Sequence, residues 1–404
     1  MITPIALIRN LKSTVRAKPV QSVISAAVVV AIILVGLALL NVHAATSVMA
    51  VETDTGTATT NAKTVTDATA SGAKALKFTA PVTGVPAQCA TGGTYLWANL
   101  ALCGWPDATN TGYVLSECGG ALTTSTLSKD SLGVIHVTTN NTTISCQNIT
   151  GCVSVEATGV TIKNNLIKGC NGFGIRGAAN GTGTVVIDDG ASATVTQNEL
   201  NGQKLVHACI WHQGVSMTAT KNNCYNIDDG IFSWADTSYS QTTGDQFTIQ
   251  DNYLHDFTAA TSNGHIDGYQ TEGAANGLIT HNTFLMTAAD NTNDTDSAVA
   301  IWNSLKSSHD ITVSNNLMTG GGFTVYAEDY DPSEASPGGG FSVTNIFFTN
   351  NKFSTHMFGC VGGYGVWYVR GAPTDQWRRS GNVVLETGFN LDNGNPTFNG
   401  SPCI

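Results

Sequence analysis

The stretches FTIQDNYL (247–254) and LITHNTF (278–284) share one design. Each is a short strand-like run that ends in an asparagine, and a large apolar side chain follows two positions later. An alternating run of this kind predicts a β-strand with one buried face. The same unit recurs at GVTIKNNLI (159–167), ATVTQNEL (193–200), MTATKNNCY (217–225), ITVSNNLM (311–318), IFFTNNKF (346–353) and RRSGNVV (378–384). We assign Asn165, Asn198, Asn223, Asn252, Asn282, Asn316, Asn351 and Asn382 to the repeat.

A repeat of about 30 residues forms one coil that cannot bury its own apolar face, so successive coils must stack on a shared core. An asparagine at the same corner of every coil can bond its amide to the coils on either side, and asparagine tolerates the bent backbone of a corner. The sequence therefore predicts an all-β parallel β-helix, a solenoid. A β-sandwich is the alternative, but it does not predict an asparagine at every corner.

The N-terminal part of the chain has a different character. Residues 1–44 carry four basic and no acidic side chains around the apolar run VISAAVVVAIILVGLALL (23–40), and Val42 and Ala44 fit a small-residue cleavage site. This order predicts a signal peptide, with an uncleaved membrane anchor as the alternative. Residues 45–77 are rich in Thr and Ala and predict a flexible linker. The β-helix domain with its N-terminal cap is expected at 78–404.

Charge and cysteine content narrow the function. The net charge is −11, which disfavours binding to nucleic acid. The ten cysteines are even in number and form no C-x-x-C pair, so in a chain outside the cytoplasm we expect disulfides rather than a zinc site. Cys146–Cys152 and Cys360–Cys403 are reasonable pairs, although spacing leaves the connectivity open. The protein is expected to be extracellular, secreted or anchored at the cell surface, with membrane contact only through an uncleaved N-terminal segment.

A second strand follows each asparagine corner: GFGIRG (172–177), ACIWHQ (208–213), DGIFSW (229–234), DGYQTE (267–272), VAIWNS (299–304), FTVYAE (323–328) and GVWYVR (365–370). If their central aliphatic residues point inward, the next residues point outward and stack in a column about 4.8 Å apart. That column would contain Trp211, Phe232, Gln270, Trp302 and Tyr326. Exposed rings in a row suit the apolar faces of sugars. In the alternative, loops cover these rings or the rings face inward.

Two aspartates fall at matching turns of adjacent coils. Asp229-Gly230-Ile231 and Asp267-Gly268-Tyr269 are in equivalent register, which predicts neighbouring carboxylates with His265 beside them. Like charges at that distance raise one pKa, and so provide a proton donor and a base. Glycoside cleavage uses such a pair. We therefore predict Asp229, Asp267 and His265 as catalytic residues, and an ordinary Asp-Gly turn is the alternative.

Further residues are expected to bind substrate around this pair. His212 lies one coil earlier, Gln270 and Glu272 follow Asp267, and Glu328 lies two coils later. Long segments at 255–266, 286–297 and 328–340 are expected to wall the column into a cleft. No cofactor is assigned firmly. Calcium remains a candidate because DNTNDTDS (290–297) is dense in oxygen ligands, but it lacks the glycine and glutamate of an EF-hand loop, and a solvated polar loop is the favoured alternative. His281 is expected to be structural, and His207 carries no strong signal.

The region 85–404 resembles a known family, the secreted right-handed parallel β-helix repeat proteins of the pectate-lyase-like and glycosyl-hydrolase-like superfamily of actinobacterial type. GWPDATNTGY (104–113) is similar to the family's entry motif, and TGCVSVEATGVTIKNNLIKG (150–169) to its first coils. DNYLHDF (251–257), HIDGYQ (265–270), LMTGGGFTVY (317–326) and SGNVVLETG (380–388) follow in the family's order. Tyr269 stands where the family usually has Ile. The resemblance implies the fold and a carbohydrate-active class, without a defined substrate.

Two functions remain open. The first is an enzyme that cleaves a polysaccharide or cell-wall glycan, with hydrolysis favoured over elimination because basic residues that could neutralise a uronate are sparse around these coils. The second is a non-catalytic surface protein that binds glycan through the same cleft.

Overall fold

The computed structural model describes residues 62–66, 74–78, 85–170, 183–233, 246–258, 265–288, 295–303, 305–328, 341–370 and 377–403. Of 62–66, 74–78, 328, 369 and 370, only the backbone is described. The chain divides into two units, Met1–Thr83 and Gly84–Ile404. In the first unit, β1 (Ala62–Thr66) pairs antiparallel with β2 (Lys74–Phe78), within or next to the segment predicted as a linker. The apolar run 23–40 lies outside the described residues, and none of the described helices could span a membrane.

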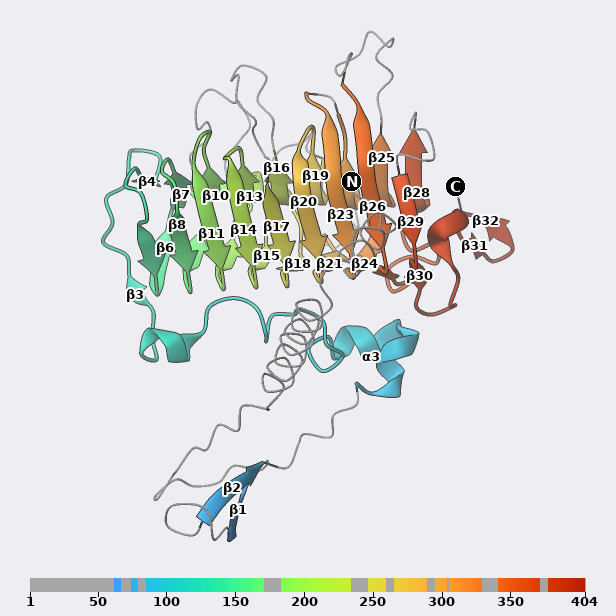
Figure 1. The fold of residues 1–404 in the computed structure, drawn as a ribbon, viewed down its shortest axis with the longest axis horizontal. Coiled ribbons are helices and arrows are strands. Elements are labelled where there is room, and N and C mark those ends of the chain that lie inside the picture. The colour runs from blue at the N-terminus through green and yellow to red at the C-terminus, as the bar shows by residue number, and fades with distance from the viewer. Residues whose placement is uncertain are drawn as a thin grey trace, which may run out of the picture. The chain divides into compact units, whose positions relative to one another are not determined.

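The second unit is a parallel β-helix, as predicted (Figure 1). Each coil contributes one strand to each of three sheets, and every pairing within these sheets is parallel. The first sheet contains β4 (Val134–Val137), β7 (Cys152–Val155), β10 (Gly183–Ile187), β13 (Ala208–His212), β16 (Asp229–Ser233), β19 (Asp267–Thr271), β22 (Ser297–Ile301), β25 (Phe323–Glu328) and β28 (Gly365–Arg370).

The other two sheets follow the first in every coil. The second sheet contains β5 (Thr143–Ser145), β8 (Val160–Lys163), β11 (Ser192–Thr196), β14 (Ser216–Thr220), β17 (Phe247–Gln250), β20 (Ala275–Thr280), β23 (Ser308–Ser314), β26 (Val343–Thr349) and β29 (Trp377–Ser380). The third contains β3 (Thr123–Thr124), β6 (Gln147–Thr150), β9 (Leu166–Lys168), β12 (Glu199–Asn201), β15 (Asn223–Tyr225), β18 (Tyr253–Leu254), β21 (Thr283–Met286), β24 (Leu317–Gly320), β27 (Lys352–Phe353) and β30 (Val383–Val384).

Burial differs between the sheets. The second sheet alternates buried and partly exposed residues, as in β11 and β14, so one face lies on the core and the other meets solvent. In the first sheet, all five residues of β10, β13, β16, β19 and β22 are buried. The first sheet is thus covered on both faces over these strands, so the expected column of side chains is not open to solvent there.

The predicted asparagine ladder is present, with one change of residue. From Asn165 onward, each ladder amide donates Nδ2–H to the Oδ1 of the next ladder asparagine at 2.9–3.1 Å. The third member is Asn222, whereas we predicted Asn223. Consequently the apolar residue two positions later is Cys224, which is fully buried, and Tyr225 is only partly buried. The last member, Asn382, donates to Asp392 Oδ1 at 3.0 Å, which ends the ladder.

The corner itself is made by the residue before each ladder asparagine. This residue has a positive φ at Asn164, Gln197, Lys221, Asp251, His281, Asn315 and Asn350, and Gly381 occupies the same place in the last coil. A left-handed residue turns the chain from the second sheet into the third, and the ladder asparagine then bonds the neighbouring coil.

The N-terminal cap folds over the third sheet (Figure 1). It contains the 3₁₀ helix η2 (Ala87–Thr91), the helix α3 (Gly93–Ala98) and the 3₁₀ helix η3 (Leu115–Cys118). Leu96 and Leu100 pack with Tyr253 and Leu317 of β18 and β24 in a separate apolar cluster. At the other end of the chain lie η4 (Leu391–Asn393) and the antiparallel pair β31 (Thr397–Phe398) and β32 (Ser401–Pro402).

Five disulfides join the ten cysteines. Cys360–Cys403 is confirmed. The predicted Cys146–Cys152 pair is wrong, because Cys146 bonds Cys118 of the N-terminal cap and Cys152 bonds Cys170 at the end of the same coil. The remaining bonds are Cys89–Cys103 and Cys209–Cys224. Such a set of bonds indicates an oxidising, extracellular environment.

Two predicted second strands are also placed differently. In the coil before β13, the first-sheet strand is β10, Gly183–Ile187, while residues 172–177 lie outside the described residues. In the coil of β22, the residue paired with Tyr269 is Val299, not Ile301. Trp302 therefore follows the end of its strand.

Candidate functional site

Asp229 and Asp267 are neighbours, as the register predicts. Ile231 pairs with Tyr269, which sets the two aspartates at the same level of β16 and β19. The backbone N–H of Asp267 donates to Asp229 Oδ1 at 3.0 Å. On the next strand, the hydroxyl of Ser297 donates to Asp267 Oδ1. Stacked coils thus bring together two carboxylates that are 38 residues apart in the chain.

The glycine after each aspartate has a packing reason. A Cβ on Gly230 would lie 2.3 Å from Leu254 Cδ2, and a Cβ on Gly268 would lie 2.5 Å from Phe284 Cδ1. Leu254 and Phe284 belong to the core, so these positions face inward. Asp229 lies on the outer side of the sheet, because its partner His207 also contacts the rings of Trp211 and Phe232, which pack apart from the main core. The Asp-Gly pairs therefore mark close approach between sheets.

The aspartates do not lie on an open surface, contrary to our expectation. Asp228, Asp229 and Asp267 are all completely buried. The outer side of β16 and β19 is covered at this point, in keeping with the full burial of both strands.

His207, which we expected to be uninformative, is the histidine that contacts the carboxylates. It lies immediately before β13, with Nδ1 2.9 Å from Asp228 Oδ2 and Nε2 3.1 Å from Asp229 Oδ2. Both ring nitrogens thus face carboxylate oxygens, and both can donate only in the imidazolium form. The side chain is 16% exposed, so it alone of the four connects this cluster to the surface. We call His207, Asp228, Asp229 and Asp267 the acidic cluster.

Burial and charge set the protonation of the acidic cluster. Burial by itself lowers the pKa of His207, but the charges of Asp229 and Asp228 outweigh it and raise that pKa to about 10. Burial raises the pKa of Asp229, and the positive His207 opposes this. Burial and the charge of Asp229 raise the pKa of Asp267 well above its ordinary value. Two adjacent carboxyls thus differ in their tendency to hold a proton.

His265 is not beside the carboxylates, so that prediction is wrong. Its side chain is 63% exposed and lies 3.8 Å from Asp296 Oδ2. Its ring meets the edge of Trp302 at a centroid distance of 5.2 Å. His265 lies two residues before Asp267, where the chain has not yet entered β19, and so it follows Asp296 of the next coil.

The expected column exists in part. Backbone pairing aligns Trp211, Phe232, Gln270, Ala300, Tyr326 and Tyr368 across six strands. Ala300 takes the place that we gave to Trp302. Trp211 and Phe232 meet edge to face at 4.6 Å, but only 4% and 1% of them is exposed. Gln270 is buried as well, so an exposed row of rings is absent over β13, β16 and β19.

A more accessible group of rings lies at the other end of the column. Tyr326 and Tyr368 are partly exposed and have ring centroids 5.2 Å apart. Phe323 contacts both, and Tyr364, at 59% exposure, lies 5.6 Å from Phe323. We call these four residues the tyrosine patch. Tyr364 and Tyr368 were not predicted, although GVWYVR contains the second of them at the outward position.

The remaining predicted binding residues fall elsewhere. His212 is completely buried at the end of β13, and burial lowers its pKa to about 3, so it is an interior residue. Glu272 is partly exposed in the turn after β19, where its carbonyl accepts from Leu305 and Lys306. The backbone of Glu328 pairs with Arg370, and its side chain is not among those described.

A metal site is not evident in the described part of the chain, where no group of three or more His, Cys, Asp or Glu side chains has the geometry to hold an ion. Most of the oxygen-rich stretch 290–297 lies outside the described residues. His207 has carboxylate partners on both nitrogens, which leaves neither free as a ligand.

No protein-family model matches the chain, and no curated protein is significantly similar to it. The parallel β-helix therefore stands on the strand pairing alone, and the pectate-lyase-like resemblance remains an argument from motifs.

Proposed function

We propose that this protein is an extracellular, carbohydrate-active β-helix protein that cleaves a polysaccharide by acid–base chemistry at Asp229 and Asp267. The observation that carries the proposal is the stacked carboxyl pair beside His207. Proton transfer to a glycosidic oxygen needs a carboxyl that stays protonated, and its partner must be ionised.

The proposed roles follow from the contacts. Asp267, with the strongly raised pKa, is the acid, and its Oδ2 has no hydrogen-bond partner among the described residues. Asp229 is the base or nucleophile, because the His207 imidazolium favours its charged form. Asp228 shares the imidazolium and fixes the orientation of the ring. His207 would then act as a positioning residue.

Hydrolysis is favoured over elimination. A lyase must neutralise a uronate carboxylate, which takes a metal ion or a free cationic side chain. The cation nearest the pair is His207, and its two nitrogens already face Asp228 and Asp229. The site therefore suits a neutral glycan better than an acidic one. The tyrosine patch, on the same sheet, offers rings on which sugar units could stack.

The test is a product-release screen of the full-length protein on neutral and acidic polysaccharides. Wild type should release products whose new non-reducing ends are saturated, and Asp229→Asn and Asp267→Asn should each lower the rate by at least 100-fold. Asp310→Asn is the control, because Asp310 is half exposed and pairs with His309 outside the cluster. Unsaturated products would instead identify a lyase, and equal activity of all variants would refute the assignment.

A second candidate function is supported by one observation, the complete burial of all three carboxyls. A protein that only binds glycan, for adhesion or wall attachment, needs no carboxyl accessible to substrate. In that case wild type releases no product from any glycan, yet binds one, and Tyr326→Ala and Tyr368→Ala weaken the binding while Asp267→Asn does not.

A further inference from the structure

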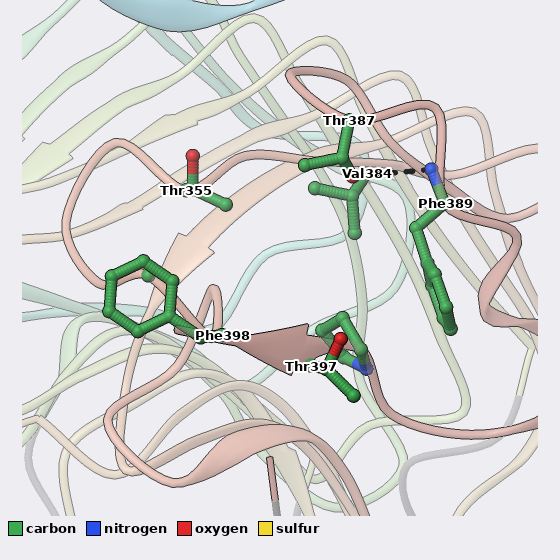
Figure 2. A pocket seen from close by; sticks show the side chains of 8 residues that line it. Thr355, Val384, Thr387, Phe389, Thr397 and Phe398 are labelled. Carbon is green, nitrogen blue, oxygen red and sulfur yellow. Dashed lines mark hydrogen bonds between the residues drawn. The ribbon is translucent and has the colours of Figure 1, made fainter. Parts of the chain in front are cut away.

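The C-terminal end of the solenoid contains a pocket that lies outside the acidic cluster and the tyrosine patch. It encloses about 530 Å³, within the range of small-molecule sites. Its lining is Thr355, Gly359, Val384, Thr387, Phe389, Pro396, Thr397 and Phe398. Figure 2 shows the rings of Phe389 and Phe398 on opposite sides of it. We call it the terminal pocket.

Two exposed phenyl rings distinguish the terminal pocket. Phe389 is 38% and Phe398 is 47% exposed, whereas the other phenylalanines whose side chains are described are buried or only partly exposed. Both line the same cavity. Exposed large apolar side chains scattered singly need no explanation, but two that face one cavity mark a binding site.

The walls are held by bonds within the protein. The disulfide Cys360–Cys403 joins the segment of Gly359 to the β31–β32 pair that carries Phe398. Phe398 lies so close to Gly359 that a Cβ there would be 2.2 Å from its ring. On the opposite side, Val384 donates its N–H to the carbonyl of Phe389 at 3.0 Å. The ring of Phe398 and the backbone of Phe389 are therefore positioned before any ligand binds, which lowers the entropic cost of binding.

The chemistry of the lining residues indicates the class of ligand. None of the lining residues is charged, which disfavours an ionic ligand that would lose its hydration. Thr355, Thr387 and Thr397 place hydroxyls around the cavity, and no hydrogen bond within the described chain engages the hydroxyl of Thr355 or of Thr397. Apolar faces together with free hydroxyls fit a neutral molecule that itself has apolar C–H faces and hydroxyl groups.

We infer that the terminal pocket binds one or two units of a neutral saccharide, stacked on Phe398 or Phe389 and hydrogen-bonded to Thr355 and Thr397. This inference goes beyond the proposed cleavage, since the terminal pocket contains no acid or base. It would hold a glycan at the end of the solenoid independently of the first sheet.

The experiment is isothermal titration of the full-length protein with cellobiose as a neutral probe and digalacturonate as an acidic one. Cellobiose should bind saturably, and Phe389→Ala and Phe398→Ala should each weaken binding by about tenfold or more. Leu278→Ala, which removes another exposed apolar side chain on β20, should bind as wild type does. Digalacturonate should bind more weakly than cellobiose.

Further variants separate the outcomes. If either alanine variant unfolds, Thr355→Val and Thr397→Val decide, because they keep the shape and remove the free hydroxyls; each should weaken cellobiose binding several-fold. Asp310→Asn, outside the acidic cluster and the terminal pocket, should leave it unchanged. Because the terminal pocket contains no acid or base, a failure of the cleavage proposal does not affect this test. Three outcomes would overturn the inference. The first is that cellobiose does not bind saturably, and the second is that digalacturonate binds more tightly than cellobiose. The third outcome is that Phe398→Ala, Thr355→Val and Thr397→Val all bind cellobiose as tightly as wild type does.

Discussion

At the scale of single residues, the asparagine ladder shows how the backbone conformation of one residue determines which side chain joins the ladder. Asn222 donates its amide to Asn252 Oδ1 at 2.9 Å and to the carbonyl of Val195 at 2.9 Å. Asn223, next to it, contacts His255 through its Oδ1 at 2.9 Å, away from the ladder. The two residues are identical in type, and only the position of the left-handed Lys221 decides which one enters the ladder.

This difference gives a direct prediction. Asn222→Ala removes the ladder bonds in a buried corner and leaves backbone carbonyls without partners, so the free energy of unfolding should fall by about 2–4 kcal/mol. Asn223→Ala should cost about 1 kcal/mol. Chemical denaturation gives the free energy of unfolding of each variant. An equal decrease in the two variants would contradict the observed register.

The acidic cluster makes a second prediction, on pH. The pKa of His207 is raised to about 10 from an unfolded value of about 6.5, so the stabilisation that it contributes is complete below about pH 6.5 and is lost as pH rises toward 10. In this window the free energy of unfolding should fall by up to about 1.4 kcal/mol per pH unit. His207→Gln should flatten the slope, whereas His309→Gln, at an exposed histidine, should not. If His207→Gln leaves the pH dependence of the free energy of unfolding unchanged, His207 is not protonated in the folded protein.

At the scale of elements, the N-terminal cap is held to the third sheet by two Trp–His stacks. Trp97 stacks on His356 at 5.0 Å and Trp105 on His281 at 5.3 Å. His281 also bridges Asp251 Oδ1 at 2.6 Å and the carbonyl of Gly104 at 2.9 Å. Both of its nitrogens therefore face acceptors, and the bridge is complete only when the ring is protonated.

The cap should therefore loosen at high pH. The bond to Asp251 raises the pKa of His281, so its contribution is complete below the unfolded value and is lost as pH rises through the raised one. Amide hydrogen exchange over 93–105 should quicken in that range, after correction for the intrinsic rate. His281→Asn, which tolerates the left-handed corner, should abolish the change, and Lys221→Asn at the equivalent corner should preserve it. Unaltered exchange in wild type would show that the bridge does not hold the cap.

At the scale of the whole molecule, disulfides close loops of different length along the solenoid. Cys360–Cys403 spans 43 residues, and Cys89–Cys103 spans 14. A longer closed loop restricts the unfolded chain more. Replacing Cys360 and Cys403 by serine should lower the free energy of unfolding by about 4 kcal/mol. Replacing Cys89 and Cys103 should lower it by about 3 kcal/mol. Thermal and chemical unfolding of the two double variants test this order, which a reversed ranking would contradict.

The sequence by itself determined the repeating coil, seven of the eight asparagine corners and the adjacency of Asp229 and Asp267, because period-2 strands with an asparagine at a nearly fixed offset must stack coil on coil. It also indicated the Cys360–Cys403 bond. Only the tertiary structure decided which side chains share a site. His207 reaches the carboxylates from the preceding coil, while His265, much nearer to Asp267 in sequence, turns to Asp296 and Trp302.

The sequence also could not predict which outward-facing side chains are buried. Alternation shows which side of a strand a residue faces, but not whether another part of the chain covers that side. Trp211 and Phe232 face away from the main core as predicted and are nevertheless buried, as are Asp229 and Asp267. The terminal pocket escaped prediction for the same reason, since Thr355, Phe389 and Phe398 come from separate segments that only the stacked end of the solenoid and its disulfide bring together.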